Sequence, residues 1–311
     1  MKKIVVIGGG HGQSLILKSL KDLPDIELSA IVTVADNGGS TGILRKLYNL
    51  PAMGDIRNVL VALASDEGII NQIMDYRFHG DDESDLSGHS LGNLIITALC
   101  DIEGSFQNAI LEISKLLNIK GRVIPSTVEN ISLYARMDDD TIVKGEASIP
   151  SFNHHIKEVF YDHEVKASPQ AVEAIRNADL IIYGIGSLYT SILPNIIIPG
   201  IREALSETKA YKVYFLNCMT QNNETFDYDM KDHLDAMEKH GAPIDLVIRH
   251  NNPIPEEVRK SYLKENSIEV VDNRNTDIKV LSTDLLDFTG NLVRYKPDKV
   301  REVISDLIKE L

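Results

Sequence analysis

The chain has 311 residues, of which 43% are hydrophobic and 25% are charged, and its formal net charge at pH 7 is −14. These proportions are those of a globular protein with a sizeable core, and no apolar run reaches the roughly 18 residues that a membrane span needs. The negative charge and the scattered lysines and arginines argue against nucleic acid as a partner, because a phosphate backbone is bound by a basic stripe.

Short β-branched runs recur along the chain, with amphipathic segments between them. The runs that we predict to be strands are residues 3–7, 27–34, 121–127, 179–185, 212–218, 244–250 and 268–272. The segments that we predict to be helices include Gln13–Leu23, Ile56–Ala64, Leu91–Cys100, Ile192–Leu205 and Asp229–His240. Most of the runs are apolar throughout, as strands covered on both faces must be. The alternation predicts an α/β fold with a doubly wound, Rossmann-like, mostly parallel sheet.

The chain is predicted to form one Rossmann-like domain, residues 1–311, because no proline- or serine-rich linker divides it. Residues 131–149 interrupt the alternation with two strand-like runs and an acidic turn, which predict an inserted antiparallel β-hairpin. The apolar stretch after MKK is too short for a signal peptide, so we expect a cytoplasmic protein. Cys100 and Cys218 lie in apolar contexts and are interpreted as buried thiols.

Loops rich in glycines, hydroxyls or amides follow five of the predicted strands. In a parallel sheet all five exits lie on one edge, which is where such sheets bind ligands. The first loop, Gly8–Gly12, supplies two glycines of the Gly-x-Gly-x-x-Gly fingerprint, but Gln13 stands in place of the third. By itself this loop is a weak indication of a nucleotide.

The second loop, Asp36–Gly42, has glycines that allow close backbone approach, and Ser40 and Thr41 can cap the helix that follows. Asp36 ends the strand where a Rossmann acid meets a ribose. A micromolar ligand needs about 8 kcal/mol, and one charge-assisted hydrogen bond contributes roughly 1.5–3. Several loops must therefore act together, and the ligand is expected to be extended and polyanionic.

Two other polar pairs are interpreted as structural. His154 and His155 have no cysteine or acid at a recognised metal-binding spacing, so they are expected to be surface or packing residues. His89 and Ser90 are neighbours before a predicted helix, which favours an N-cap over nucleophilic catalysis.

Six segments, in chain order, resemble the family that joins the gluconeogenesis factors to the 2-phospho-L-lactate transferases. They are GGGHGQS, VADNGGSTG, GDIRNVLVALA, GHSLGN, GIGSLYTSILPN and LNCMTQNNET. The resemblance covers nearly the whole chain and implies a Rossmann-like fold that binds a phosphorylated or nucleotide-linked small molecule. The segment DNGGSTG looks like the gluconeogenesis-factor branch.

The two branches imply different functions. The factor branch implies a cytoplasmic regulator of cell shape and envelope synthesis on gluconeogenic carbon, which binds a UDP-sugar such as UDP-N-acetylglucosamine, has protein partners and requires no cofactor. The transferase branch implies a magnesium-dependent enzyme that moves a phospholactyl group from a nucleotide-diphospho donor. A dinucleotide oxidoreductase ranks third because the third fingerprint glycine is missing. Catalytic residues stay unassigned, and a homo-oligomer stays open.

The resemblance and the loops together select the expected ligand-binding residues. They are Gly9, Gly10, His11, Gly12, Asp36, Asn37, Gly38, Gly39, Ser40, Thr41, Arg45, Arg57, Asn58, Gly186, Ser187, Tyr189, Thr190, Asn217, Thr220, Tyr262 and Arg294. The two glycine loops are expected to hold a diphosphate, and Asp36 or Asn37 to orient a ribose or sugar hydroxyl. The arginines are expected to balance charge. In the transferase alternative, Asp36 and Asp55 would hold magnesium.

Overall fold

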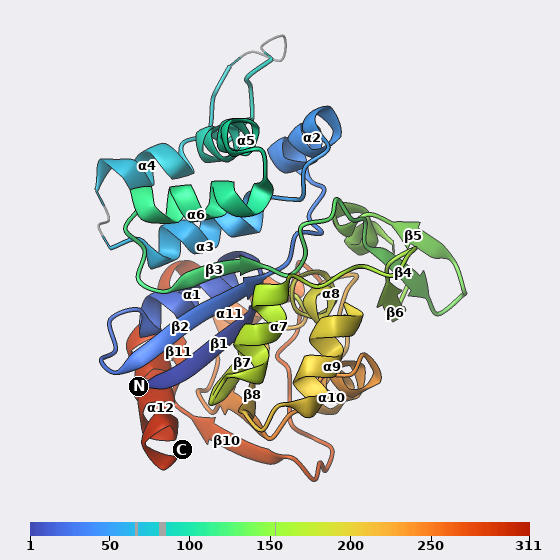
Figure 1. Cartoon of the computed structure of the whole chain (residues 1–311). Helices are drawn as coiled ribbons and strands as arrows, with labels where there is room; N and C mark the ends of the chain where they lie inside the picture. Colours follow the sequence, from blue (N-terminus) through green and yellow to red (C-terminus); the bar gives the residue numbers. More distant parts are fainter. Residues whose placement is uncertain (66–67, 81–84, 153) are drawn as a thin grey trace.

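Seven parallel strands form the main sheet, in the order β10-β9-β8-β7-β1-β2-β3 (Figure 1). The structure, a computed structural model, describes residues 1–65, 68–80, 85–152 and 154–311. The sheet strands are β1 (Lys2–Gly8), β2 (Ile26–Val32), β3 (Arg122–Pro125), β7 (Leu180–Tyr183), β8 (Tyr211–Phe215), β9 (Leu246–His250) and β10 (Lys279–Thr283). Every neighbouring pair is parallel, which confirms the predicted fold class.

The sheet is doubly wound. The helices are α1 (Gly10–Leu20), α2 (Gly39–Tyr48), α3 (Gly54–Leu63), α4 (Ile69–Asp75), α5 (Leu91–Glu103), α6 (Phe106–Leu116), α7 (Pro169–Arg176), α8 (Leu193–Ile196), α9 (Pro199–Glu207), α10 (Met230–Lys239), α11 (Glu256–Leu263) and α12 (Pro297–Glu310). In Figure 1, α7 and α9 lie in front of the sheet, and α1 lies behind it against α3 and α12. Strand order reverses between β1 and β7, where the core residues Ile4–Ile7 are almost fully buried.

Two predicted elements were wrong in detail. The seventh sheet strand is β10, whereas residues 268–272 do not join the main sheet. There Ile268 and Val270 bond to the backbone of Thr220 and Cys218, and so cover the loop after β8 instead of joining the sheet. The predicted helix 192–205 is broken into α8 and α9, because Pro199 excludes helical backbone at the residue before it.

The predicted hairpin is present and is longer than expected. Strands β4 (Tyr134–Met137) and β5 (Ile142–Lys144) pair antiparallel, and a third strand, β6 (Ile156–Phe160), pairs with β4 beyond the predicted end at residue 149. The short helix η1 (Glu146–Ser151) connects β5 to β6. Figure 1 shows this three-stranded unit, hereafter the insertion, to one side of the main sheet.

Gln13 replaces the third fingerprint glycine for a structural reason. Its side-chain amide donates to the carbonyls of Val6 and Ile31, both at 2.9 Å, and thereby joins β1 to β2 from below. Gln13 is fully buried, so it faces the core and not a ligand.

Both cysteines are buried free thiols, as predicted. Across the part of the chain that the structure describes, no single helix has the length and apolarity to cross a membrane. The α5–α6 pair meets those criteria only jointly, and it is bent by 120°.

Candidate functional site

The glycine loops after β1 and β7 lie against each other where the strand order reverses. No Cβ would fit at Gly12, because the carbonyl of Ile185 from the β7 loop stands there. Asn217, after β8, donates its side-chain N–H to the carbonyl of Gly186 at 3.0 Å and accepts the hydroxyl of Tyr214 at 3.1 Å. Three strand exits are therefore joined at the carboxyl edge of the sheet, which is the ligand-binding edge of this fold class.

A cleft of about 640 Å³ opens beside these loops. Its walls are His11, Gly12, Ser14, Leu15, Lys18, Ile185, Asn217, Cys218, Met219, Thr220, Gln221, Tyr262, Val293, Arg294, Tyr295 and Pro297. The hydroxyl of Tyr262 accepts the backbone N–H of Val293 at 3.0 Å and so ties α11 to the segment that carries Arg294. Among the described residues these walls include no Asp or Glu, in a chain with 46 acidic residues.

The cleft brings together six residues that the sequence selected from four distant segments. They are His11, Gly12, Asn217, Thr220, Tyr262 and Arg294. Lys18, on the outer face of α1, was not predicted, because a single exposed lysine carries no motif. Lys18 lies one helical turn after Ser14 on α1, the helix that follows the first glycine loop. That spacing could have indicated that Lys18 lies near the loop.

Three carboxyl groups gather on the other side of the β1 loop. Asp36 accepts the backbone N–H of Gly38 at 2.8 Å. Asp55, in the first turn of α3, accepts the N–H of Gly10, and its burial and the nearby charge of Asp36 raise its pKa from 3.8 to about 7. Burial, with the charges of Asp36 and Asp55, raises the pKa of Glu146 from 4.5 to about 8. The predicted pair Asp36 and Asp55 is thus brought together, and the insertion adds Glu146, which the sequence analysis missed.

Ser40 and Thr41 are buried against the segment that contains His89. Ser40 Oγ and His89 Nδ1 share a hydrogen bond at 3.1 Å, and Asn93 donates to Thr41 Oγ1 at 3.3 Å. The N-cap of α2 is Gly38, so the predicted capping role of the two hydroxyls is wrong. Through these bonds the two hydroxyls anchor the second glycine loop to the segment of His89 and Asn93.

Arg45 also forms hydrogen bonds with that loop. Its guanidinium donates to the carbonyls of Asp36 at 2.6 Å and Ala35 at 3.3 Å, to Asn130 at 2.7 Å, and to the carbonyl of Ile131. Burial lowers the pKa of Arg45. The contacts fix the loop and the start of the insertion, and its expected charge-balancing role stays a prediction.

Arg57 lies on α3 beside the carboxyl groups. It donates to the hydroxyl of Ser90 and to Asn58 Oδ1 at 2.6 Å. Its buried Nε has no partner within the described part of the chain. Ser90 is the N-cap residue of α5, as predicted, but its hydroxyl serves Arg57 and not the helix.

A buried acid from the loop after β8 accepts hydrogen bonds from the third glycine loop, residues 184–191 after β7. Glu224, 4% exposed, accepts the backbone N–H of Tyr189 at 2.8 Å and the hydroxyl of Thr190 at 3.2 Å. Burial raises its pKa from 4.5 to about 7, although these hydrogen bonds act in the opposite direction. Gln221 donates to Ser187 Oγ at 2.7 Å in the same contact. The predicted residues Ser187, Tyr189 and Thr190 therefore have partners inside the fold.

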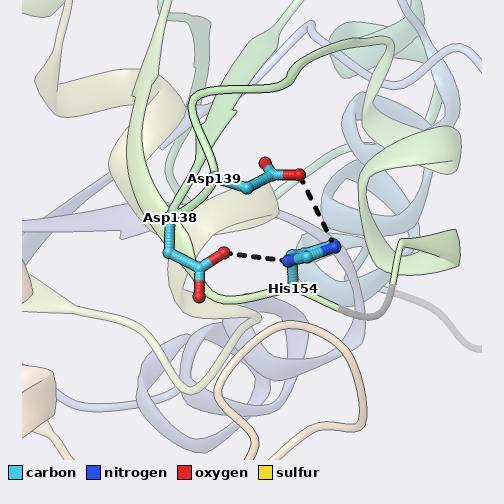
Figure 2. A group of neighbouring side chains, drawn as sticks. All are labelled: Asp138, Asp139 and His154. Carbon is cyan, nitrogen blue, oxygen red and sulfur yellow. Dashed lines mark hydrogen bonds and ion pairs between the residues drawn. The ribbon is translucent and has the colours of Figure 1, made fainter.

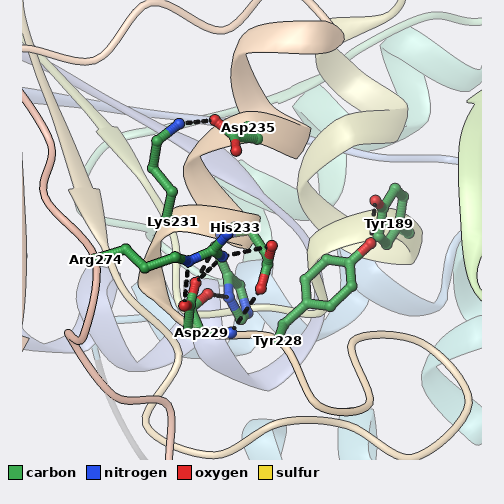
Figure 3. Close-up of polar contacts among 8 residues, drawn as sticks. Tyr189, Tyr228, Asp229, Lys231, His233, Asp235 and Arg274 are labelled. Atoms are coloured by element: carbon green, nitrogen blue, oxygen red, sulfur yellow. Dashed lines mark hydrogen bonds and ion pairs between the residues drawn. The ribbon is translucent and has the colours of Figure 1, made fainter.

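The hydroxyls of Tyr189 and Tyr228 share a hydrogen bond at 2.9 Å, and Figure 3 shows the neighbouring ion pairs. Arg274 bonds to both Asp229 and Asp232, which form a capping box at the start of α10. The ion pairs of Arg274 fasten the segment before β10 to the start of α10, and the tyrosine pair joins the loop after β7 to the segment before α10.

His154 is a surface residue, as predicted. Figure 2 shows its two ring nitrogens facing two carboxylates of the insertion, with Nδ1 at 3.0 Å from Asp138 and Nε2 at 3.6 Å from Asp139. All three residues are exposed. His155 stacks on Phe226 with ring centroids 5.1 Å apart, which is the predicted packing role.

The fold and the edge that joins its glycine loops define a Rossmann-like α/β protein whose candidate site lies at the topological switch point. Residues 4–286 match the family described as 2-phospho-L-lactate transferase CofD. The chain is 40% identical to the gluconeogenesis factor of Bacillus subtilis, over 99% of this chain and 98% of that protein. It is 43% identical to the gluconeogenesis factor of Halalkalibacterium halodurans, over 98% of this chain and 96% of that protein.

Solved structures agree with these relatives. A crystal structure of a UPF0052 family member from Bacillus halodurans superposes with a TM-score of 0.93 at 42% identity, covering 98% of this chain and 99% of that chain. The chain therefore belongs to the family that unites the gluconeogenesis factors with CofD-type proteins.

Proposed function

We propose that this protein is a gluconeogenesis factor that binds a UDP-sugar, of the UDP-N-acetylglucosamine type, at the switch-point edge. In this proposal it is a cytoplasmic regulator, and its partners read the liganded state to adjust cell shape and envelope synthesis on gluconeogenic carbon. The observation that carries it is the cleft beside the first glycine loop, whose charged side chains are cations only. A cleft of this kind concentrates anions even on a protein with a net charge of −14.

The phosphates are expected between the first-turn backbone of α1 and the cations of the cleft. Helix α1 has no acidic residue in its first turn and no side-chain cap. Lys18 is exposed, and Arg294 lines the same cleft. Helix N-termini and guanidinium groups are the usual partners of phosphate oxygens, and aromatic Tyr262 offers a face for a base. This arrangement suits binding without requiring a cofactor.

Calorimetry with UDP-N-acetylglucosamine tests the proposal. The wild-type protein should bind at submillimolar concentration, and Lys18→Ala and Arg294→Ala should each weaken binding about tenfold or more, since a hydrogen bond to a charged group contributes roughly 1.5–3 kcal/mol. Lys264→Ala, an exposed lysine outside the cleft, is the matched control. No binding by folded wild-type protein, or equal losses with the control, would refute the proposal.

A second candidate is a magnesium-dependent transferase of a phospholactyl-type group. The observation that favours it is the convergence of Asp36 and Asp55 beside the first glycine loop, because carboxylates are the donors that magnesium prefers. Bound there, magnesium would supply charge neutralisation for phosphate oxygens, and Asp36 and Asp55 would hold it. Product formation from a nucleotide-diphospho-lactate donor and a deazaflavin, abolished in Asp55→Asn, would establish this function in place of the first.

A further inference from the structure

The two sides of the first glycine loop have opposite charge. The amide of Gly10 contacts the carboxyl of Asp55, whereas His11 and Gly12 line the cation-bearing cleft. Two residues of chain span at most about 7 Å, so a ligand that crosses this loop is close to both groups. The site is therefore bipolar, and the ligand it fits should carry negative charge at one end only.

The insertion places an acid at the negative end of this site. The backbone N–H of Ala147 donates to Asn37 Oδ1 at 2.9 Å. Gly145 has a φ of 100°, which L residues rarely adopt, and its α-carbon lies so close to the Asn37 amide that no Cβ would fit. These contacts dock the first turn of η1 onto the second glycine loop and leave the half-buried carboxyl of Glu146 beside Asp36.

The charged groups that raise the pKa of Glu146 come from three other elements, and these groups are acidic. They are Asp36 from the loop after β2, Asp55 from α3 and Glu224 from the loop after β8. A contrast is the groove of about 580 Å³ between β10 and α12, where Lys279 and Lys299 alternate with acids. At the candidate site, by contrast, the cations lie on one side of the first glycine loop and the acids lie on the other.

On the basis of the proposed nucleotide-sugar function, we propose that Glu146 is a specificity-determining residue that selects ligands with an uncharged sugar. The phosphates would lie in the cleft and the sugar would reach Asp36 and Glu146. Carboxylates accept hydrogen bonds from sugar hydroxyls, and they repel a second carboxylate. The ligand class is thus nucleotide-linked neutral sugars, and sugars oxidised to acids are disfavoured.

UDP-glucose and UDP-glucuronate form a matched pair of probes, because they differ only by a hydroxymethyl and a carboxylate group on the sugar. Calorimetry would be done with EDTA, so that no divalent cation bridges the carboxylate of the probe to those of the protein. Wild-type protein should bind UDP-glucose at least tenfold more tightly than UDP-glucuronate. Glu146→Gln should reduce that ratio severalfold, and Glu164→Gln, an exposed glutamate of the same region, should leave it unchanged.

The outcomes separate the two proposals. If neither UDP-N-acetylglucosamine nor UDP-glucose binds, the proposed function fails and this inference fails with it. If both probes bind equally well to wild-type protein, the inference alone is overturned, and this result needs no variant. A wild-type preference that Glu146→Gln leaves intact also overturns the role of Glu146, provided that circular dichroism shows the variant to be folded.

Discussion

Glu224→Gln should change the pH dependence of stability by an amount that the buried environment of Glu224 sets. The pKa of Glu224 is raised from 4.5 to about 7, so the folded state holds this proton more tightly than the unfolded state does. Between pH 4.5 and 7 the native protein therefore binds more protons, and its unfolding free energy falls as the pH rises. A shift of this size corresponds to about 3 kcal/mol. The cost is absent below pH 4.5 and complete above pH 7.

Glutamine keeps an oxygen for the N–H of Tyr189 and has no ionisation, so the variant avoids that cost. Relative to wild type, Glu224→Gln should gain up to about 3 kcal/mol of stability between pH 4.5 and pH 8. Urea unfolding followed by far-ultraviolet circular dichroism measures this difference at each pH. The pKa of Glu146 should also fall in the variant, because the charge of Glu224 contributes to raising it. Acids that do not interact with Glu224 titrate equally in both proteins and cancel. A difference that does not vary with pH, or that Glu164→Gln reproduces, would contradict the assigned cause.

Two further substitutions test the internal contacts of the site. Arg45→Met should lower the unfolding free energy by at least about 3 kcal/mol, because several buried carbonyls lose their donor, and urea midpoints at constant m-value would check it. Gln13→Leu should cost about 2 kcal/mol in the same assay while leaving ligand affinity unchanged, since its two hydrogen bonds join β1 to β2 below the site.

The sequence was sufficient for six of the seven sheet strands and for the edge at which the glycine loops gather. Apolar β-branched runs and glycine loops are local signals, and strands β1, β2, β7, β8 and β9 lie close to their predicted ranges. The seventh strand was misplaced because residues 268–272 and 279–283 both have the composition of a strand. Pairing with the loop after β8, a tertiary contact, decides between them.

The carboxyl groups of the site could not be found in the same way. Glu146 and Glu224 are single acids in polar segments, and only the folded chain brings them to the glycine loops, from positions more than 100 residues after Asp36 and more than 30 residues after the β7 loop. Ser40 and Arg45 illustrate the reverse case. Their motif predicted ligand contacts, and packing against His89 and the insertion gives them partners inside the protein.

The positions of these acids bear on where a phosphate would bind. Asp55, Asp36 and Glu224 each accept one backbone N–H from a different glycine loop, at Gly10, Gly38 and Tyr189 respectively. A phosphate at any of these three amides would have to displace a carboxylate or bring a cation to it. The cleft beside His11 imposes neither condition, because its charged side chains are cations. Without metal, a diphosphate should therefore bind on the cleft side, and magnesium should affect binding only for ligands that also carry negative charge at the Asp36 end.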